Sequence, residues 1–257
     1  ICSGTSTGIA LTSTPTGATF AWTVVESGTS GASAGNGSSI NQTLTATGTA
    51  VGTATYTVTP TLGTCVGTPI NVVITVNPTP VVLATPSNET ICSGTSTGIA
   101  LSSTPAGATF AWTVTESGSS GASAGSGSSI NQTLSATGAA VGTTTYTVTP
   151  TLAGCPGLPI DVVITVNPIP TVAATPATET ICSGDVTGIA LSSTPAGATF
   201  AWTVTQSNVS GAAAGTGAAI NQTLTSLSAA GGSATYTVTP TLNGCVGTPI
   251  DVVINVS

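Results

Sequence analysis

Six cysteines are the residues whose spacing most plainly suggests chemistry. They recur two to each 90-residue interval, always 63 residues apart, as Cys2/Cys65, Cys92/Cys155 and Cys182/Cys245. Paired cysteines at constant spacing are typical of a disulfide framework formed in an oxidising compartment. A zinc site is the competing interpretation, but two thiolates without a histidine make only half of the usual ligand set. We therefore expect one disulfide within each repeat, no metal and no other cofactor.

The carboxylates do not form a catalytic set. The seven acids are Glu26, Glu89, Glu116, Asp161, Glu179, Asp185 and Asp251. In the third repeat Gln206 replaces the equivalent of Glu26, and in the first repeat Asn71 replaces the equivalent of Asp161. An acid that can be exchanged for its amide is a poor candidate for proton transfer. The chain also has no histidine and no lysine, so the usual bases of nucleophilic catalysis are missing. The sequence predicts that the protein is not an enzyme.

Calcium at the repeat junctions is an alternative use of two of these acids. Glu89 and Glu179 precede Cys92 and Cys182 and follow the Pro-containing connections closely. Calcium takes six to eight oxygen ligands, and a single carboxylate supplies few of them. We favour solvated acids at strand ends over a calcium site.

The charge composition excludes several partners. The chain has no lysine or arginine and a formal net charge of -7. Phosphate groups of nucleic acids and anionic membrane surfaces are held mainly by those two residue types, so neither partner is expected. No apolar run reaches the 18 or so residues of a membrane helix. The chain opens at Ile1-Cys2, which matches the middle of the later repeats, so we interpret it as a window of a longer protein.

The cysteines lie in a threefold tandem repeat. Two sets of aromatic residues recur every 90 positions and are the expected core anchors: Trp22, Trp112 and Trp202, and Tyr56, Tyr146 and Tyr236. A fixed period defines the architecture before any local feature does. We divide the chain into residues 1–77, where the first strand is expected to be missing, 78–167 and 168–257. Each unit is large enough to have its own core.

Strand signals dominate each unit. Apolar residues alternate with small polar ones around Trp22, around Tyr56 and from Ile70 to Val76, which is the pattern of half-buried strands. Residues 27–39 read as a Gly/Ser/Ala loop with nothing to bury. Residues 81–84 are either the first strand of the second unit or a strand that bridges two units. About seven short strands per unit predict an immunoglobulin-like β-sandwich, all-β.

Three surface features carry weaker hypotheses. Threonine rows such as Thr55/Thr57/Thr59 could bind ice or carbohydrate, but high β propensity explains them better. Asn-x-Ser/Thr sequons, which could carry glycans, occur at Asn36, Asn41, Asn88, Asn131, Asn208 and Asn221. Strand edges are usually guarded by lysine, and these have none. We therefore expect self-association through strand edges, with identical chains or neighbouring repeats.

The combined motifs also resemble a known family. The run Ile40-Asn-Gln42-Thr-Leu44, then Tyr56-Thr-Val58-Thr-Pro60, then Gly-Cys before a Pro-Ile-x-Val-x-Ile strand ending in Val-Asn-Pro resembles the PKD-like repeats of giant secreted and surface proteins of gliding and related bacteria. The resemblance covers all three units. It implies an Ig-like sandwich that serves as a spacer in adhesins, stalks and filaments.

The function expected from the sequence is structural. We expect a repeat module of an extracellular, secreted or cell-surface bacterial fibre or adhesin stalk that assembles into filaments through its unguarded edges. The alternative is an adhesin module that binds carbohydrate or a host surface. Exposed aromatic side chains would favour that alternative, because they are the usual sugar platforms.

Overall fold

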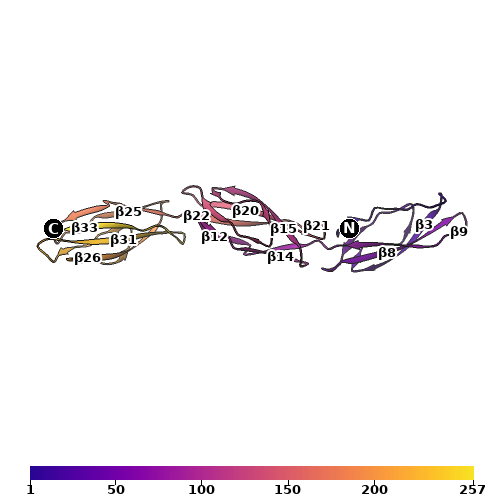
Figure 1. The fold of residues 1–257 in the computed structure, drawn as a ribbon, viewed down its shortest axis with the longest axis horizontal. Helices are drawn as coiled ribbons and strands as arrows, with labels where there is room; N and C mark the ends of the chain where they lie inside the picture. Colours follow the sequence, from indigo (N-terminus) through magenta and orange to yellow (C-terminus); the bar gives the residue numbers. More distant parts are fainter.

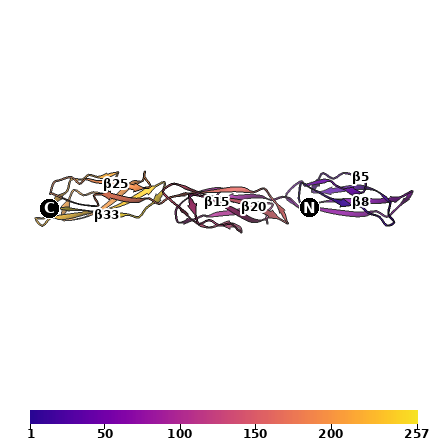
Figure 2. The same cartoon turned by 90° about the horizontal axis from the view of Figure 1, so that it is seen from above.

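The structure, a computed structural model, describes all 257 residues and contains strands but no helix. Three β-sandwiches follow one another along a single line, so the molecule is a rod (Figures 1 and 2). The first sandwich lies at one end and the third at the other, and the chain ends at the outer tip of the third (Figure 1). The all-β tandem architecture expected from the 90-residue period is confirmed.

The second sandwich shows the complete unit. Its strands are β11 (Val81–Thr85), β12 (Asn88–Cys92), β13 (Thr95–Ser96), β14 (Ile99–Thr104), β15 (Thr109–Ser117), β16 (Ser119–Ser120), β17 (Gly125–Ser126), β18 (Ser129–Ile130), β19 (Thr133–Ala136), β20 (Gly142–Leu152), β21 (Cys155–Pro156) and β22 (Ile160–Asn167). One layer has the order β12-β22-β20-β15-β17, with β21 paired to β20. The opposite layer consists of β11-β14-β18 and β13-β19-β16.

The third sandwich repeats this plan. Its strands are β23 (Thr171–Thr175), β24 (Thr178–Ile181), β25 (Ile189–Thr194), β26 (Thr199–Ser207), β27 (Val209–Ser210), β28 (Gly215–Thr216), β29 (Ala219–Ile220), β30 (Thr225–Ser226), β31 (Gly232–Leu242), β32 (Cys245–Val246) and β33 (Ile250–Val256). Its larger sheet has the order β24-β33-β31-β26-β28, and β23-β25-β29 lies opposite.

The first sandwich lacks two strands of this plan. Its strands are β1 (Thr5–Ser6), β2 (Ile9–Ala10), β3 (Thr19–Ser27), β4 (Thr29–Ser30), β5 (Gly35–Asn36), β6 (Ser39–Ile40), β7 (Thr43–Ala46), β8 (Gly52–Leu62), β9 (Cys65–Val66) and β10 (Ile70–Val76). Nothing in it corresponds to β11, and only Ile1 and Cys2 correspond to residues of β12; the Ile1 carbonyl accepts a hydrogen bond from the Asn77 amide, and Cys2 bridges Asn77. Its buried core has 7 residues against 14 in each of the others, so this unit is the least closed.

Alternation along the two long strands builds each core. In the second sandwich Trp112 pairs with Val148, and Tyr146 lies between Val114 and Val162 on the same face. Tyr146, Val148 and Val162 have no exposed surface. Strand residues with period two place every second side chain inside, which is why the Thr partners of this pattern face outward.

Two segments differ from or refine the sequence interpretation. Val81–Thr85 is β11, which pairs antiparallel with β14, so it is the first strand of the second sandwich and not a bridging strand. The segment 27–39 is not a loop with nothing to bury. It contains β4 and β5, and Gly35 lies under the Trp22 indole so closely that a Cβ there would be 2.8 Å from the ring.

Candidate functional site: the joints between sandwiches

The hairpin that carries Cys155 forms one half of each joint. In this hairpin β20 and β21 pair Leu152 with Cys155, so only Ala153 and Gly154 form the turn. Both have positive φ, 49° and 79°. Two-residue hairpin turns with positive φ at both positions match the twist of the strands. Asn243-Gly244 forms the same turn in the third sandwich, and the turn projects the cysteine at the tip of the unit.

The other half of the joint is the leading cysteine of the preceding unit. Cys92 ends β12, which pairs in parallel with β22 so that Cys92 lies beside Asn167. The Ser93 amide donates a hydrogen bond to the Asn167 carbonyl at 2.8 Å. Cys2 lies beside Asn77 in the same way. Each leading cysteine therefore sits where the chain leaves its unit for the next one.

This placement overturns the expected disulfide pairing. Within one unit the leading cysteine lies at the Gly52 end of β8, whereas the hairpin cysteine lies at its Leu62 end. Eleven strand residues span about 33 Å at roughly 3.3 Å each. A disulfide requires Cα atoms within about 7 Å. The pairs Cys2/Cys65, Cys92/Cys155 and Cys182/Cys245 are therefore wrong.

The disulfides join neighbouring sandwiches. Cys2 is bonded to Cys155, with Cα atoms 5.5 Å apart, and Cys92 is bonded to Cys245, with Cα atoms 5.6 Å apart. Each bond crosses 153 residues of sequence. There are two disulfides in three units, one at each joint. The hairpin sulfurs belong to residues that are only 1% exposed.

The short segment that connects one sandwich to the next also packs against the hairpin at each joint. Pro78 and Pro80 are buried in the first connection, as are Pro168 and Pro170 in the second. A Cβ on Gly157 would overlap the Pro80 carbonyl oxygen, and a Cβ on Gly247 would overlap that of Pro170. Glycine is therefore required where the connection crosses the hairpin. In the second joint the Asn167 amide also donates to the Asn243 carbonyl at 3.4 Å.

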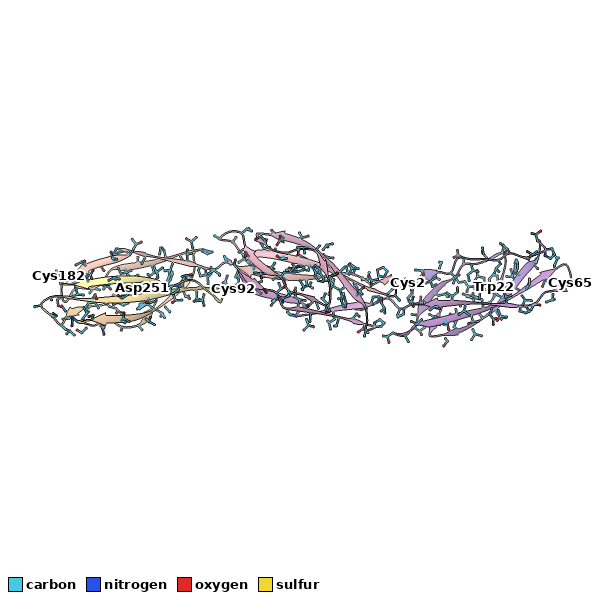
Figure 3. All side chains as sticks on the ribbon, viewed as in Figure 1. Cys2, Trp22, Cys65, Cys92, Cys182 and Asp251 are labelled. Atoms are coloured by element: carbon cyan, nitrogen blue, oxygen red, sulfur yellow. A yellow bond between two sulfur atoms is a disulfide. The ribbon has the colours of Figure 1, made fainter.

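Two cysteines remain as thiols, at opposite ends of the rod. Cys65 and Cys182 are both free and exposed. Figure 3 shows Cys65 at the outer tip of the first sandwich and Cys182 at the outer tip of the third. Cys65 corresponds to the hairpin half of a joint, and Cys182 corresponds to the leading half.

The aromatic residues expected in the core are buried, and their polar atoms hydrogen-bond to a network that extends to the surface through a half-buried glutamine. The Tyr56 hydroxyl donates to Gln42 Oε1 at 2.9 Å, and Gln42 Nε2 donates to the Ser33 carbonyl at 2.9 Å. The Trp22 indole donates to the same carbonyl at 3.1 Å. Equivalent bonds join Tyr146 to Gln132 and Tyr236 to Gln222. The sequence interpretation missed this glutamine, although it recurs in every Ile-Asn-Gln-Thr-Leu motif.

Burial changes the acidity of these phenols. Desolvation raises the pKa of Tyr146 to about 12, and the nearby Glu116 carboxylate adds to the rise. Desolvation also raises the pKa of Tyr56, with a smaller contribution from Glu26, and that of Tyr236. All three tyrosines have no exposed surface and the three tryptophans are 6–7% exposed, so none offers a stacking platform for a sugar.

The acids have structural partners. Glu89 accepts a hydrogen bond from the Gly98 amide at 3.2 Å, and Glu179 accepts one from Gly188 at 3.1 Å. These carboxylates hold strand ends within one sandwich. Asp161 accepts a hydrogen bond from the Thr147 hydroxyl at 2.7 Å, and Asn71 accepts the equivalent bond from Thr57 at 2.9 Å. No three His, Cys, Asp or Glu residues gather in a metal-binding group.

Other surface residues can be placed plainly. The asparagines of the six sequons are all exposed, and Thr55, Thr57 and Thr59 are half-buried on the central strand β8. The structure has no helix, and so none that could cross a membrane.

The profile of the PKD-like domain matches three stretches of this sequence, residues 1–80, 89–170 and 179–257. The chain belongs to the PKD-like domain family. Each match covers one sandwich, although the first strands β11 and β23 lie outside the matched ranges, so the family likeness is a property of each repeat. No curated protein matches the chain significantly.

Several solved multidomain structures are similar to the chain of PKD-like repeats. Human CDH23 EC21-23 has 11% sequence identity and a TM-score of 0.39, covering 93% of this chain and 88% of that one. Mouse Cadherin-23 EC22-24 has 9% identity and a TM-score of 0.37, covering 100% and 94%. Protocadherin Gamma B2 extracellular cadherin domains 3-6 have 11% identity and a TM-score of 0.33, covering 91% and 68%.

Proposed function

We propose that this chain is a stiff structural segment of an extracellular bacterial fibre or adhesin stalk. The observation that carries the proposal is the pair of disulfides that join neighbouring PKD-like repeats instead of closing single ones. A bond that closes one domain stabilises that domain, whereas a bond between domains restricts how they rotate. Disulfides also imply an oxidising compartment, which supports a secreted or cell-surface location.

Two further features support a load-bearing rod. The connections are short and their prolines are buried, and proline fixes its own φ, so the joints have few ways to bend. In the chain-entropy model, closing a loop of 153 residues contributes about 5 kcal/mol against unfolding. Repeats of this class are typical of structural or adhesive roles, which fits a chain without histidine or lysine.

Lateral assembly into filaments is the finer part of the proposal. The edge strand β11 presents Val81 and Leu83 outward, 67% and 61% exposed, and no lysine guards it or any other strand. Unguarded apolar edges favour pairing with other chains. Sedimentation at increasing concentration should therefore show reversible association that a Leu83→Lys substitution weakens. A chain that stays strictly monomeric at high concentration would contradict lateral assembly.

Small-angle X-ray scattering tests whether the two disulfides stiffen the joints between repeats. The double variant Cys2→Ser/Cys92→Ser should keep three folded repeats but show a broader distribution of interdomain distances than the native chain. The control is Cys65→Ser/Cys182→Ser, which removes two cysteines without touching a joint and should scatter like the native chain. If both double variants scatter alike, the disulfides do not stiffen the rod and the proposed function fails.

A further inference from the structure

A glutamine carboxamide in the first repeat is hydrogen-bonded at both of its polar atoms. Gln42 Oε1 accepts from the Tyr56 hydroxyl and from the Ser33 amide, both at 2.9 Å. Gln42 Nε2 donates to the Ser33 carbonyl at 2.9 Å and to Ser33 Oγ at 3.0 Å. A serine hydroxyl therefore contacts the nitrogen that is bonded to the carboxamide carbon.

The two donors at the carboxamide oxygen resemble an oxyanion hole. Such donors stabilise the negative charge that an acyl oxygen gains when a nucleophile adds to its carbon. Tyr56 has no exposed surface and Gln42 is half-buried, so the hydrogen bond between them is partly shielded from water. Burial raises the pKa of Tyr56, so its hydroxyl stays protonated and remains a donor at neutral pH.

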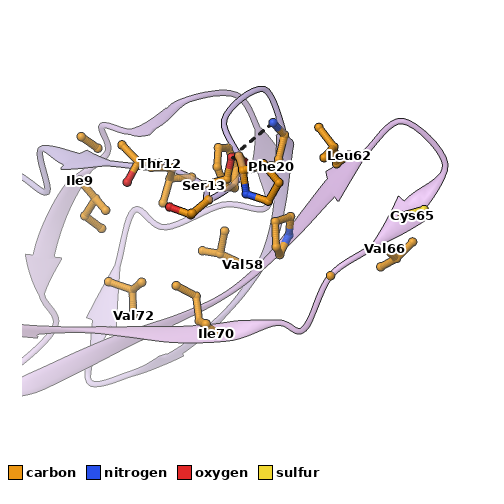
Figure 4. A pocket seen from close by; sticks show the side chains of 17 residues that line it. Ile9, Thr12, Ser13, Phe20, Val58, Leu62, Cys65, Val66, Ile70 and Val72 are labelled. Atoms are coloured by element: carbon orange, nitrogen blue, oxygen red, sulfur yellow. Dashed lines mark hydrogen bonds between the residues drawn. The ribbon is translucent and has the colours of Figure 1, made fainter.

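The second repeat contains the same arrangement. Gln132 Oε1 accepts from the Tyr146 hydroxyl and from the Ser123 amide, both at 2.9 Å. Gln132 Nε2 donates to the Ser123 carbonyl at 2.9 Å and to Ser123 Oγ at 3.1 Å. An apolar groove of about 520 Å³ in the first repeat is lined by other residues (Figure 4), so the arrangement does not depend on that groove.

A carboxylate lies beside the serine in both repeats. Glu26 Oε1 accepts from the Ala32 amide at 2.8 Å, and Glu116 Oε1 accepts from the Ala122 amide at 2.9 Å. Each of these alanines directly precedes the serine, so the carboxylate holds the backbone that carries the hydroxyl. Glu26 and Glu116 are therefore positioning residues for the serine.

The third repeat keeps the glutamine but lacks both the hydroxyl and the carboxylate. Gln222 Oε1 accepts from the Tyr236 hydroxyl at 2.9 Å and from the Ala213 amide at 2.8 Å. Ala213 stands in the place of the serine, and Gln206 stands in the place of the glutamate. The glutamine therefore forms its structural hydrogen bonds without these two groups, which leaves them available for chemistry in the first two repeats.

We propose that the first two repeats each form an internal ester crosslink, between Ser33 and Gln42 and between Ser123 and Gln132, and that the third repeat forms none. The reaction occurs once in each repeat, so it is a maturation step of the chain and not an enzymatic turnover. It does not depend on the proposed rod function. The bond would tie the segment between β4 and β5 to the segment between β6 and β7 in the first repeat.

The covalent step is an acyl transfer from nitrogen to oxygen. The serine Oγ forms a bond to the glutamine Cδ while the tyrosine hydroxyl and the serine amide stabilise the charge on Oε1. The bond from Cδ to Nε2 then breaks, the serine proton passes to Nε2, and the nitrogen leaves as ammonia. Oγ and Nε2 are already in contact, which favours the reaction by proximity. The atoms balance without an oxidant, a reductant or a further reactant.

Mass spectrometry of the native chain tests for the crosslink. After incubation at neutral pH, the chain is reduced, denatured and cut after glutamate. Fragment 117–179 should be lighter than its sequence by one ammonia molecule, with no fragment ions from single breaks between Ser123 and Gln132, because the ring holds both ends. Fragment 180–257 should have its full mass. A full mass for fragment 117–179 would overturn the proposal.

The second repeat is the diagnostic one because its fragment contains no Asn-Gly pair. Fragment 27–89 contains Asn36-Gly37, whose asparagine can also lose ammonia by cyclising. Hydroxylamine should open an ester in fragment 117–179 and leave a hydroxamate on Gln132, one oxygen atom heavier than the original amide. A fragment that has lost ammonia but does not react with hydroxylamine would contradict an ester.

Variants of the serine identify the nucleophile. Ser123→Ala should abolish the loss of ammonia from fragment 117–179, and it should fold, because the third repeat has alanine at this position. Ser126→Ala is the control, since it removes an exposed hydroxyl from the same fragment. It should leave the loss of ammonia unchanged. Loss of ammonia that persists in Ser123→Ala would overturn the proposal.

A gain of the bond in the third repeat is the strictest test. The double variant Ala213→Ser/Gln206→Glu restores both missing groups, and its fragment 207–257 should lose one ammonia molecule that hydroxylamine replaces at Gln222. Ala213→Ser alone should react at least about tenfold more slowly, because no carboxylate holds the backbone beside the new serine. Equal rates for the two variants would overturn the role of the glutamate, and no reaction in either would contradict the acyl transfer.

Discussion

The Pro80 carbonyl oxygen lies directly over Gly157, in the space that a Cβ on that residue would occupy. Gly157 follows Cys155 by two residues, and Cys155 is bonded to Cys2, so the connection and the disulfide both hold the segment that carries Cys155. The joint therefore depends on a residue with no side chain as much as on the cysteines.

Gly157→Ala should open the first joint. The added methyl group forces the Pro80 carbonyl away, and the hairpin that carries Cys155 moves with it. In a low concentration of dithiothreitol, which reduces accessible disulfides first, alkylation of the native chain should label mainly the two free thiols, whereas in this variant the Cys2–Cys155 disulfide should be reduced as well and labelling should extend to both of its cysteines. Gly67→Ala is the matched control, because no connection crosses that hairpin. Unchanged labelling in both variants would show that the contact does not support the disulfide.

Gly125→Ala should destabilise the second repeat. A Cβ there would lie 2.9 Å from the Trp112 indole, which is itself 7% exposed and cannot move into solvent freely. Overpacking of this kind costs roughly 1–3 kcal/mol. Hydrogen exchange measured by mass spectrometry should show faster exchange confined to the second repeat. Gly138→Ala, with no atom within 4 Å of its Cβ position, should exchange like the native chain.

Alkali should destabilise the second repeat before its tyrosine ionises in the native state. Burial raises the pKa of Tyr146 to about 12, against 10.0 for the free phenol. The unfolded chain therefore loses this proton at lower pH than the folded chain. The contribution of the Tyr146 proton to the free energy of unfolding is therefore fully present below pH 10, and it is lost as the pH rises from 10 to about 12. Tyrosinate absorbance should appear near pH 10 in urea and well above it in buffer; coincident titrations would contradict the burial.

The sequence predicts the fold well because its signals are local. The 90-residue period and the alternation around Trp22 and Tyr56 are visible without any long-range information, and strands follow from them. The cysteine pairing is different, because a spacing of 63 recurs in this chain together with a spacing of 153, and periodicity cannot separate them. The deciding fact is that the two cysteines of one unit lie at opposite ends of the strand Gly52–Leu62.

The polar network around the tyrosine was also not predicted from the sequence pattern. Gln42 reads as an ordinary polar strand residue until the fold brings it to the Tyr56 hydroxyl.

Disulfide mapping tests the central claim that the bonds join repeats. The free thiols are alkylated, the chain is denatured without reduction, and an endoproteinase that cleaves after glutamate cuts at Glu26, Glu89, Glu116 and Glu179. The structure predicts that fragment 1–26 is linked to 117–179 and fragment 90–116 to 180–257, with Cys65 alkylated in 27–89. Linkage of fragment 1–26 to 27–89, and of 90–116 to 117–179, would show that the bonds lie within single repeats. That result would contradict a rod whose repeats are joined by disulfides.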